Sequence, residues 1–194
     1  MAVETKSISG GDRAISSLFN FKKAEKKADD VNILIEKCSS SKECLAELYH
    51  MFKQSVFAVA FSITSDYHLS EDCVSETFIR LTQTKNFNSS KGDGKGYILT
   101  LARNVAFELR RRHKRDNTSF VIQSYGDAEQ TVEDSIYINQ LMKHLNDKQR
   151  QIVVLKCCAE LTFKQIAKIM KCPESTVKSR YQKAISVLNE KAGE

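Results

Sequence analysis

The sequence predicts an all-α protein of two small helical domains joined by an acidic linker. A single proline and seven glycines in 194 residues leave long stretches without a helix breaker. Apolar residues recur at steps of three and four, whereas the alternation typical of strands is scarce. We expect a weakly ordered extension at 1–30, helical domains at 31–115 and 135–194, and a linker at 116–134.

Four helices are predicted in the first domain. The segment "NILIEKC" forms a short one, and a third begins at Ser70, a plausible N-cap residue. The glycine- and serine-rich segment 86–96 predicts a loop, and a fourth helix runs from Tyr97 to Arg115. The second helix spans 41–64 and carries apolar residues at helical spacing: Leu45, Leu48, Phe52, Val56, Val59 and Ile63.

The second domain contains start signals for several helices. Asn146 with Gln149 marks one helix start, and Thr162 with Gln165 forms a capping-box pair for another over 162–170. Ile166, Ala167 and Met170 are expected to face the core. A short turn later, Pro173 begins a third helix, and Val177 is placed to pack back between the two. A small residue, a tight turn and a β-branched residue at these positions predict a helix-turn-helix.

The last helix has one apolar and one polar side. At about 100° per residue, an apolar side gathers Val177, Tyr181, Ala184, Ile185 and Leu188. The opposite side carries Ser175, Ser179, Gln182 and Lys183, with Lys178 and Arg180 at its edges. A helix in the major groove needs short donors and acceptors for base edges and cations for phosphates. An ordinary solvated surface has a similar pattern, and the preceding turn is what favours DNA.

Charge is concentrated in blocks along the chain. Residues 103–115 carry six basic and one acidic group (+5), residues 116–134 carry five acidic groups and no basic one (−5), and residues 135–194 carry eleven basic and five acidic groups (+6). Two basic blocks separated by an acidic stretch indicate two nucleic-acid-facing surfaces and a tether.

Several function classes are disfavoured. The six cysteines form no CxxC pair, and most lie among apolar residues. We therefore expect reduced core thiols and neither a metal nor a cofactor. A metal or thiol sensor using Cys157, Cys158 and Cys172 is a minor alternative. The histidines are scattered and no nucleophile–base pair is evident, so we expect no enzyme. No apolar run is long enough to span a membrane, and the N-terminus lacks the apolar core of a signal peptide, so we expect a cytoplasmic location.

Residues 145–188 resemble the promoter-upstream-binding domain of bacterial RNA polymerase sigma factors, in particular the extracytoplasmic-function (ECF) group. The resemblance lies in Leu145, in Gln149–Arg150, in Ile166–Ala167 and in Thr176–Arg180. Lys171 stands at a turn position where the family usually has glycine. If that residue adopts a left-handed backbone, lysine costs roughly 1 kcal/mol there.

The first domain carries a second resemblance to the same family. "LSEDCVSETFIRL" resembles the acidic helix that docks on the polymerase clamp, and "GYILTLARNVAFELRRRHKR" resembles the family's Trp-Leu-x-x-Ile-Ala-Arg-Asn helix. Tyr97 replaces the tryptophan, Leu101 the isoleucine, and Thr82 stands where a second tryptophan is common. The resemblance covers roughly residues 31–190.

This resemblance implies a sigma factor, which binds core RNA polymerase and directs promoter recognition and strand opening. It implies core-polymerase contacts from Glu71, Asp72 and Glu76. For the upstream promoter element it implies Ser175, Thr176, Lys178, Ser179, Arg180, Gln182 and Lys183. On the fourth helix, a helical wheel over 97–115 places Ile98, Leu101, Val105 and Leu109 inward, and its outward residues include Arg103, Asn104, Phe107, Arg111 and Lys114, which we assign to the downstream element. An exposed Phe107 among cations suits stacking on a base or sugar beside phosphate contacts, although Phe107 could instead pack on another segment and the arginines only add solubility. The loop 86–96 would capture an extruded base with Phe87 and Asn88, and would contact phosphate through Lys91 and Lys95.

Alternatives remain at this point. The same helix-turn-helix could serve a free-standing transcription regulator that binds duplex operator DNA, with residues 31–115 sensing or dimerising. The segment 86–96 could be a plain flexible loop, and the acidic linker could thread a basic polymerase channel or act as a solvated spacer. An anti-sigma protein is a further partner that such a factor could have. The sequence gives no account of residues 1–30 and does not reveal the promoter consensus.

Overall fold

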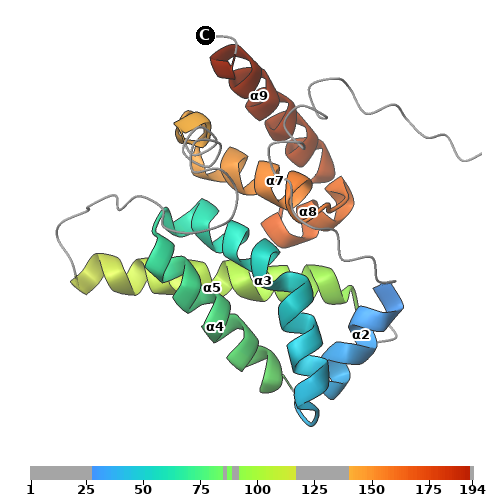
Figure 1. Ribbon diagram of the computed structural model, residues 1–194. Helices are drawn as coiled ribbons and strands as arrows, with labels where there is room; N and C mark the ends of the chain where they lie inside the picture. The colour runs from blue at the N-terminus through green and yellow to red at the C-terminus, as the bar shows by residue number, and fades with distance from the viewer. Residues whose placement is uncertain (1–27, 85–86, 89–91, 117–139, 193–194) are drawn as a thin grey trace, which may run out of the picture.

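The structure, a computed structural model, describes residues 28–84, 87–88, 92–116 and 140–192. Within these residues the regular elements are all helices, as predicted. Figure 1 shows two groups of helices, with the C-terminal group stacked on the N-terminal one. The helices are α2 (Ala28–Lys37), α3 (Lys42–Thr64), α4 (Tyr67–Thr82), α5 (Gly94–Asp116), α7 (Asp147–Cys157), α8 (Phe163–Met170) and α9 (Glu174–Ala192).

Helix α3 lies at the centre of the packing. It contacts α2, α4 and α5 in its own group, and it also contacts α7 of the C-terminal group. Its apolar stripe is buried as the spacing predicted, except that Leu45 is only partly covered. The buried members are Leu48, Phe52, Val56, Val59 and Ile63. Each contributes roughly 1.5–3 kcal/mol of hydrophobic free energy relative to an exposed side chain.

The third helix begins earlier than its sequence signals predicted. Asp66, not Ser70, is the N-cap residue of α4, and its carboxylate accepts a hydrogen bond of 2.8 Å from the Leu69 amide. Ser65 ends α3 in a left-handed conformation, so the chain reverses within two residues. Ser70 lies buried inside α4, where its hydroxyl is 2.9 Å from that of Thr64. The sequence did not indicate this short connection between α3 and α4, because its left-handed residue is a serine and not a glycine.

The fourth helix also begins earlier, at Gly94, so part of the predicted loop is helical. The Asp93 side chain accepts from the Gly96 amide at 3.0 Å and thereby caps the new helix start. Gly94 is buried against α2, where a Cβ atom would lie 2.6 Å from Asn32 Oδ1 and 2.8 Å from Ile35 Cδ1. The glycine that suggested a loop is therefore needed for a close approach between two helices.

The predicted helix starts of the C-terminal group are confirmed. Asn146 with Gln149 and Thr162 with Gln165 both form complete capping boxes. Helix α8 ends at Lys171, and α9 follows directly after Pro173. Val177 is fully buried between them, as the helix-turn-helix pattern required. Within α8, Ile169 is buried, whereas Ala167 and Met170 are only partly covered.

Lys171 is held in a strained backbone conformation. Its φ of 51° and ψ of 49° lie in the left-handed region, which an L-residue with a side chain enters at a cost.

We predict that Lys171→Gly raises the free energy of unfolding by about 1 kcal/mol, because glycine adopts this conformation without steric strain. Urea unfolding monitored by circular dichroism measures the change. Lys168→Gly is the matched control, since Lys168 is an exposed residue inside α8 and glycine there costs about 1 kcal/mol. Equal effects of the two substitutions would contradict the assignment of strain to Lys171.

Candidate nucleic-acid interface

A polar strip on α9 faces solvent. Ser175, Lys178, Ser179, Gln182 and Lys183 are exposed, and Thr176 and Arg180 are partly covered. Lys178 is paired with Glu174 of the same helix at 2.8 Å, and both side chains remain about half exposed. We call these seven residues the α9 polar strip; they are the residues predicted for the upstream element. Their exposure agrees with the helical wheel.

The buried side of α9 fixes the direction of that strip. Val177, Tyr181, Ala184 and Leu188 are buried against α7 and α8, whereas Ile185 is partly covered. The Tyr181 ring meets Phe163 edge to face at 5.4 Å between centroids. Packing of these side chains on α7 and α8 leaves the polar residues on the solvent-exposed side of α9.

A second set of predicted residues lies on α5. Asn104, Arg111 and Lys114 are exposed, whereas Arg103 and Phe107 are partly covered. We call these five residues the α5 cationic face. The expectation of an exposed Phe107 is wrong: its ring packs against the core, and the Arg103 guanidinium lies over it at 4.8 Å. This arrangement is a cation–π contact within the protein.

The helical wheel also misjudged the buried side of α5. Ile98 and Val105 are fully buried as expected, but Leu101 and Leu109 are only partly covered. Leu99, Ala102 and Ala106 are buried instead. The reason is that α2, α3, α4 and α8 all contact α5, so more than one of its sides is covered. A single-stripe prediction assumes one covered side.

The C-terminal group covers part of the α5 cationic face. Arg103 Nε donates to Gln151 Oε1 of α7 at 3.0 Å, and Gln151 is only 3% exposed. Burial lowers the pKa of the Arg103 guanidinium from its ordinary value, because desolvation disfavours the charged form. Further along α5, Arg110 pairs with Asp147 of α7 at 3.0 Å. We call this packing of α7 and α8 on α3 and α5 the closed arrangement.

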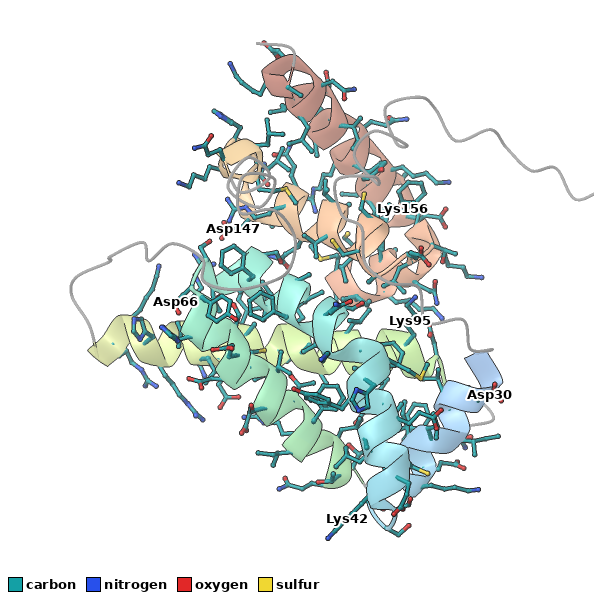
Figure 2. The ribbon with its side chains drawn as sticks, in the orientation of Figure 1. Asp30, Lys42, Asp66, Lys95, Asp147 and Lys156 are labelled. Atoms are coloured by element: carbon teal, nitrogen blue, oxygen red, sulfur yellow. The ribbon has the colours of Figure 1, made fainter. Side chains whose placement is uncertain are left out.

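Lys95, at the start of α5, lies at the same boundary between the two groups (Figure 2). Its side chain is partly covered, and burial lowers its pKa, while the carboxylates of Glu160 and Asp93 act in the opposite direction. Nearby, Gln165 Nε2 of α8 donates to Asp93 Oδ2 at 2.7 Å. The cation predicted to contact phosphate is therefore partly covered, near two carboxylates of this chain.

The predicted base-capturing residues lie only partly within the described residues. Asn88 is exposed, and Lys91 lies outside the described residues. Phe87 does not stand free: its ring is 5.1 Å from that of Tyr97, and it packs against the core. The expectation of a Phe87 side chain available for stacking is not met in this arrangement, because Tyr97 supplies an apolar neighbour within the chain.

The predicted polymerase-binding residues lie on α4. Glu71 and Asp72 are exposed, whereas Glu76 is partly covered and accepts from Arg80 at 2.6 Å. Arg80 also donates to Glu108 of α5 at 2.8 Å, which lowers the pKa of that carboxylate and raises the pKa of the guanidinium. The four-residue spacing of Glu76 and Arg80 on one helix is typical of an ion pair, so this part of the network could have been predicted from the sequence. Ile79, the exposed apolar residue that precedes Arg80, was not among the predicted site residues.

The described residues give no support for a metal site. No cluster of three potential ligands occurs among them, and all six cysteines are free thiols. Cys38, Cys73 and Cys158 are buried, and burial raises the pKa of Cys73 to about 12. No described helix combines the length and the hydropathy that a membrane crossing requires.

Comparison with protein families identifies two matching segments. Residues 48–116 match the family described as Sigma-70 region 2, and residues 135–188 match the family described as Sigma-70, region 4. The ECF RNA polymerase sigma factor SigM of Bacillus subtilis is 29% identical over 141 residues, which are 69% of this chain and 85% of SigM. SigK of Mycobacterium tuberculosis is 23% identical over 175 residues, 83% of this chain and 92% of SigK.

Two solved structures share the fold. CnrH, in complex with the cytosolic domain of CnrY, superposes with a TM-score of 0.65 at 16% identity, covering 86% of this chain and 98% of that chain. The sigma factor RpoE, in complex with the anti-sigma factor NepR from Bartonella quintana, gives 0.60 at 21% identity, covering 77% of this chain and 96% of that chain. Both likenesses concern the arrangement of helices.

Proposed function

The chain belongs to the sigma-70 family of RNA polymerase sigma factors, in its ECF group, and from this premise we propose how its helices divide the work of initiation. As a sigma factor it binds core RNA polymerase and directs promoter recognition. It performs no catalysis of its own, since RNA synthesis belongs to the core enzyme. The observation that carries the proposal is that both sigma-70 regions occur in one chain, in order, on helices α3–α5 and α7–α9.

Each interface has a different task in this proposal. The α9 polar strip enters the major groove of the upstream element, with Ser175, Ser179 and Gln182 toward base edges and Lys178, Arg180 and Lys183 toward phosphates. The α5 cationic face grips the downstream element, and Glu71, Asp72 and Glu76 of α4 bind core polymerase. The two DNA interfaces act together through effective concentration, so each can be weak alone. The work takes place in the cytoplasm, where core polymerase lies.

Other parts of the proposal lie outside the described residues. One of them is the linker from residue 117 to 134, predicted to thread a polymerase channel or to serve as a spacer; its first residue, Asp116, is instead the last residue of α5. The extension before residue 28 is another. The structural neighbours are complexes with CnrY and with the anti-sigma factor NepR. An antagonist of the anti-sigma type is therefore a partner that we propose for this chain as well.

Dependence on core polymerase tests the function. We predict that the purified protein with core polymerase transcribes from specific promoters, whereas the protein alone binds the same duplex weakly. Promoters are recovered by selecting random-sequence DNA for transcription by the assembled holoenzyme. A free-standing regulator would instead bind duplex DNA tightly without polymerase, as a dimer on a palindrome. Failure of core polymerase to capture the chain would end the proposal.

Two substitutions in the α9 polar strip separate affinity from specificity. Arg180→Ala is expected to weaken holoenzyme binding to all promoter sequences and to reduce the slope of log K against log salt by about one, because one phosphate contact is lost. Gln182→Ala is expected to change the preference at one base position. Binding across a salt series and a promoter library measures both effects. Exposed Asn189, beyond the strip on α9, is the control position, and normal transcription by both variants would contradict this placement.

The closed arrangement conflicts with DNA contact at α5. Arg103 is hydrogen-bonded to Gln151, and Lys95 is partly covered beside Glu160 and Asp93. DNA phosphates would need the same cations and the same space. We therefore propose that α7 and α8 separate from α5 when the protein binds a promoter. The apparent dissociation constant of the free protein for downstream DNA is then the intrinsic value divided by the open fraction.

Reversing one charge at the boundary tests this separation. Asp147→Arg places a cation against Arg110, so we expect a few-fold tighter binding of downstream-element single-stranded DNA by the free protein. The charge-swapped double variant Asp147→Arg with Arg110→Asp restores the pair and is expected to return affinity toward that of the wild type.

Glu43→Arg is the matched control for added charge. Glu43 is exposed and adjoins Lys42, which lies at the lower end of the molecule in Figure 2, away from Asp147 at the boundary between the two groups. Fluorescence anisotropy with a labelled oligonucleotide measures all four proteins. Equal affinities of Asp147→Arg and Glu43→Arg would show that added charge alone explains the change, and would overturn the proposed opening.

A further inference from the structure

A buried asparagine joins α2 to the start of α5. Asn32 is 7% exposed, and it lies among the buried residues Val31, Leu34 and Ile35 of the same helix. Its Nδ2 atom donates to the Gly92 carbonyl at 2.9 Å, and its Oδ1 atom accepts from the Gly94 amide at 2.8 Å. A single side chain thus hydrogen-bonds the residue before Asp93 and the residue after it, about sixty residues away in the sequence. We call Gly92–Gly94 the junction, because it joins the preceding loop to α5.

Apolar packing alone does not account for an asparagine at position 32. Its neighbours on α2 are apolar, and a leucine or valine there would add to the same apolar surface. An amide in such a site is stabilised only when its polar atoms are paired, and here both ends pair with junction backbone. The absence of a Cβ at Gly94 permits this approach, since that atom would lie 2.6 Å from Asn32 Oδ1. The two residues fit each other, and the fit fixes the position of the junction.

The junction has a second attachment, on its other side. Asp93 Oδ1 accepts from the Gly96 amide at 3.0 Å, and Asp93 Oδ2 accepts from Gln165 Nε2 at 2.7 Å. Gln165 belongs to α8, which must leave α5 in the opening proposed above. The hydrogen bond from Gln165 to Asp93 is then lost. The hydrogen bonds between Asn32 and the junction remain, because α2 is packed on α3 and α5 within the N-terminal group.

The junction directly precedes the residues that are proposed to meet the downstream element. Lys95 follows it by one residue, and α5 carries the α5 cationic face from there. Phe87 and Asn88 lie a few residues before it. A shift of the junction would move both sets relative to the promoter. Helix α2 lies outside the segment 48–116 that matches Sigma-70 region 2.

We propose that Asn32 is a positioning residue for the downstream promoter element, which keeps the junction and the start of α5 in place once α8 has left. The inference rests on the proposed function of α5 and its preceding loop. Asn32 itself touches no DNA. It acts through Gly92 and Gly94, and its contribution is to the strand-opening step, where captured nucleotides must repay the unstacking cost.

The test compares duplex and pre-melted templates. The holoenzyme is assembled from the full chain, and its promoter is one recovered from the random-sequence selection described above. A second template carries the same promoter with mismatches across the downstream element, so that no strand separation is required. Asn32→Ala is expected to reduce transcription about tenfold on the duplex template and by less than about threefold on the pre-melted one.

Control variants distinguish positioning from folding. Ile33→Ala alters a 46% exposed neighbour on α2 and is expected to transcribe like the wild type on both templates. Asn32→Ser retains one hydroxyl for hydrogen bonding, leaves a smaller gap, and is expected to fall between the wild type and Asn32→Ala. If Asn32→Ala folds poorly in urea titrations, Asn32→Ser carries the comparison.

The outcomes separate the inference from the function on which it rests. Equal losses on duplex and pre-melted templates would assign Asn32 a merely structural role and overturn the inference. Full activity of Asn32→Ala on the duplex would overturn it as well. Absence of polymerase-dependent transcription by the wild type would instead refute the proposed function, since that result does not involve Asn32.

Discussion

The apolar surface of α3 is the constraint on which the rest of the structure depends. This helix buries residues toward α2, α4 and α5, and it also meets α7. Buried apolar side chains from both groups of helices therefore form one continuous cluster. Non-directional packing of this kind tolerates exchange of one partner surface for another, unlike a network of specific hydrogen bonds. The same face of α3 and α5 can thus hold the C-terminal group in one state and release it in another.

The ion pair at that boundary is partly exposed and contributes little to holding the two groups together. The Arg110–Asp147 pair has side chains that are 25% and 51% exposed, and pairs of this kind contribute about 0.2–1 kcal/mol. Within the N-terminal group the polar contacts are different in kind. Arg80 joins Glu76 and Glu108, which ties α4 to α5, and Glu108 also pairs with Arg112. The polymerase-binding residues of α4 and the α5 cationic face are therefore linked by these ion pairs and by the packing of α4 on α5.

Local signals in the sequence predicted the secondary structure well, and long-range contacts decided where prediction failed. Capping boxes at Asn146 and Thr162, and the buried side of α9, depend on residues within a turn or two of each other. Phe107 looked exposed on a helical wheel, but a wheel contains no neighbouring helix. Gly94 looked like part of a loop because its reason for being glycine, Asn32, lies 62 positions away. Coverage of Arg103 by Gln151 likewise could not be read from spacing.

The burial of the cysteine thiols has a consequence for chemical durability. Burial raises the pKa of Cys73 to about 12 and raises the pKa values of Cys38 and Cys158 as well, so the thiolate form is strongly disfavoured at these three positions. Peroxides and disulfides react with the thiolate, so these positions are inert toward them. Oxidative damage at cysteine would fall instead on the partly covered Cys44, Cys157 and Cys172. A factor with its central sulfur atoms shielded in this way can keep its fold when the surrounding medium turns oxidising.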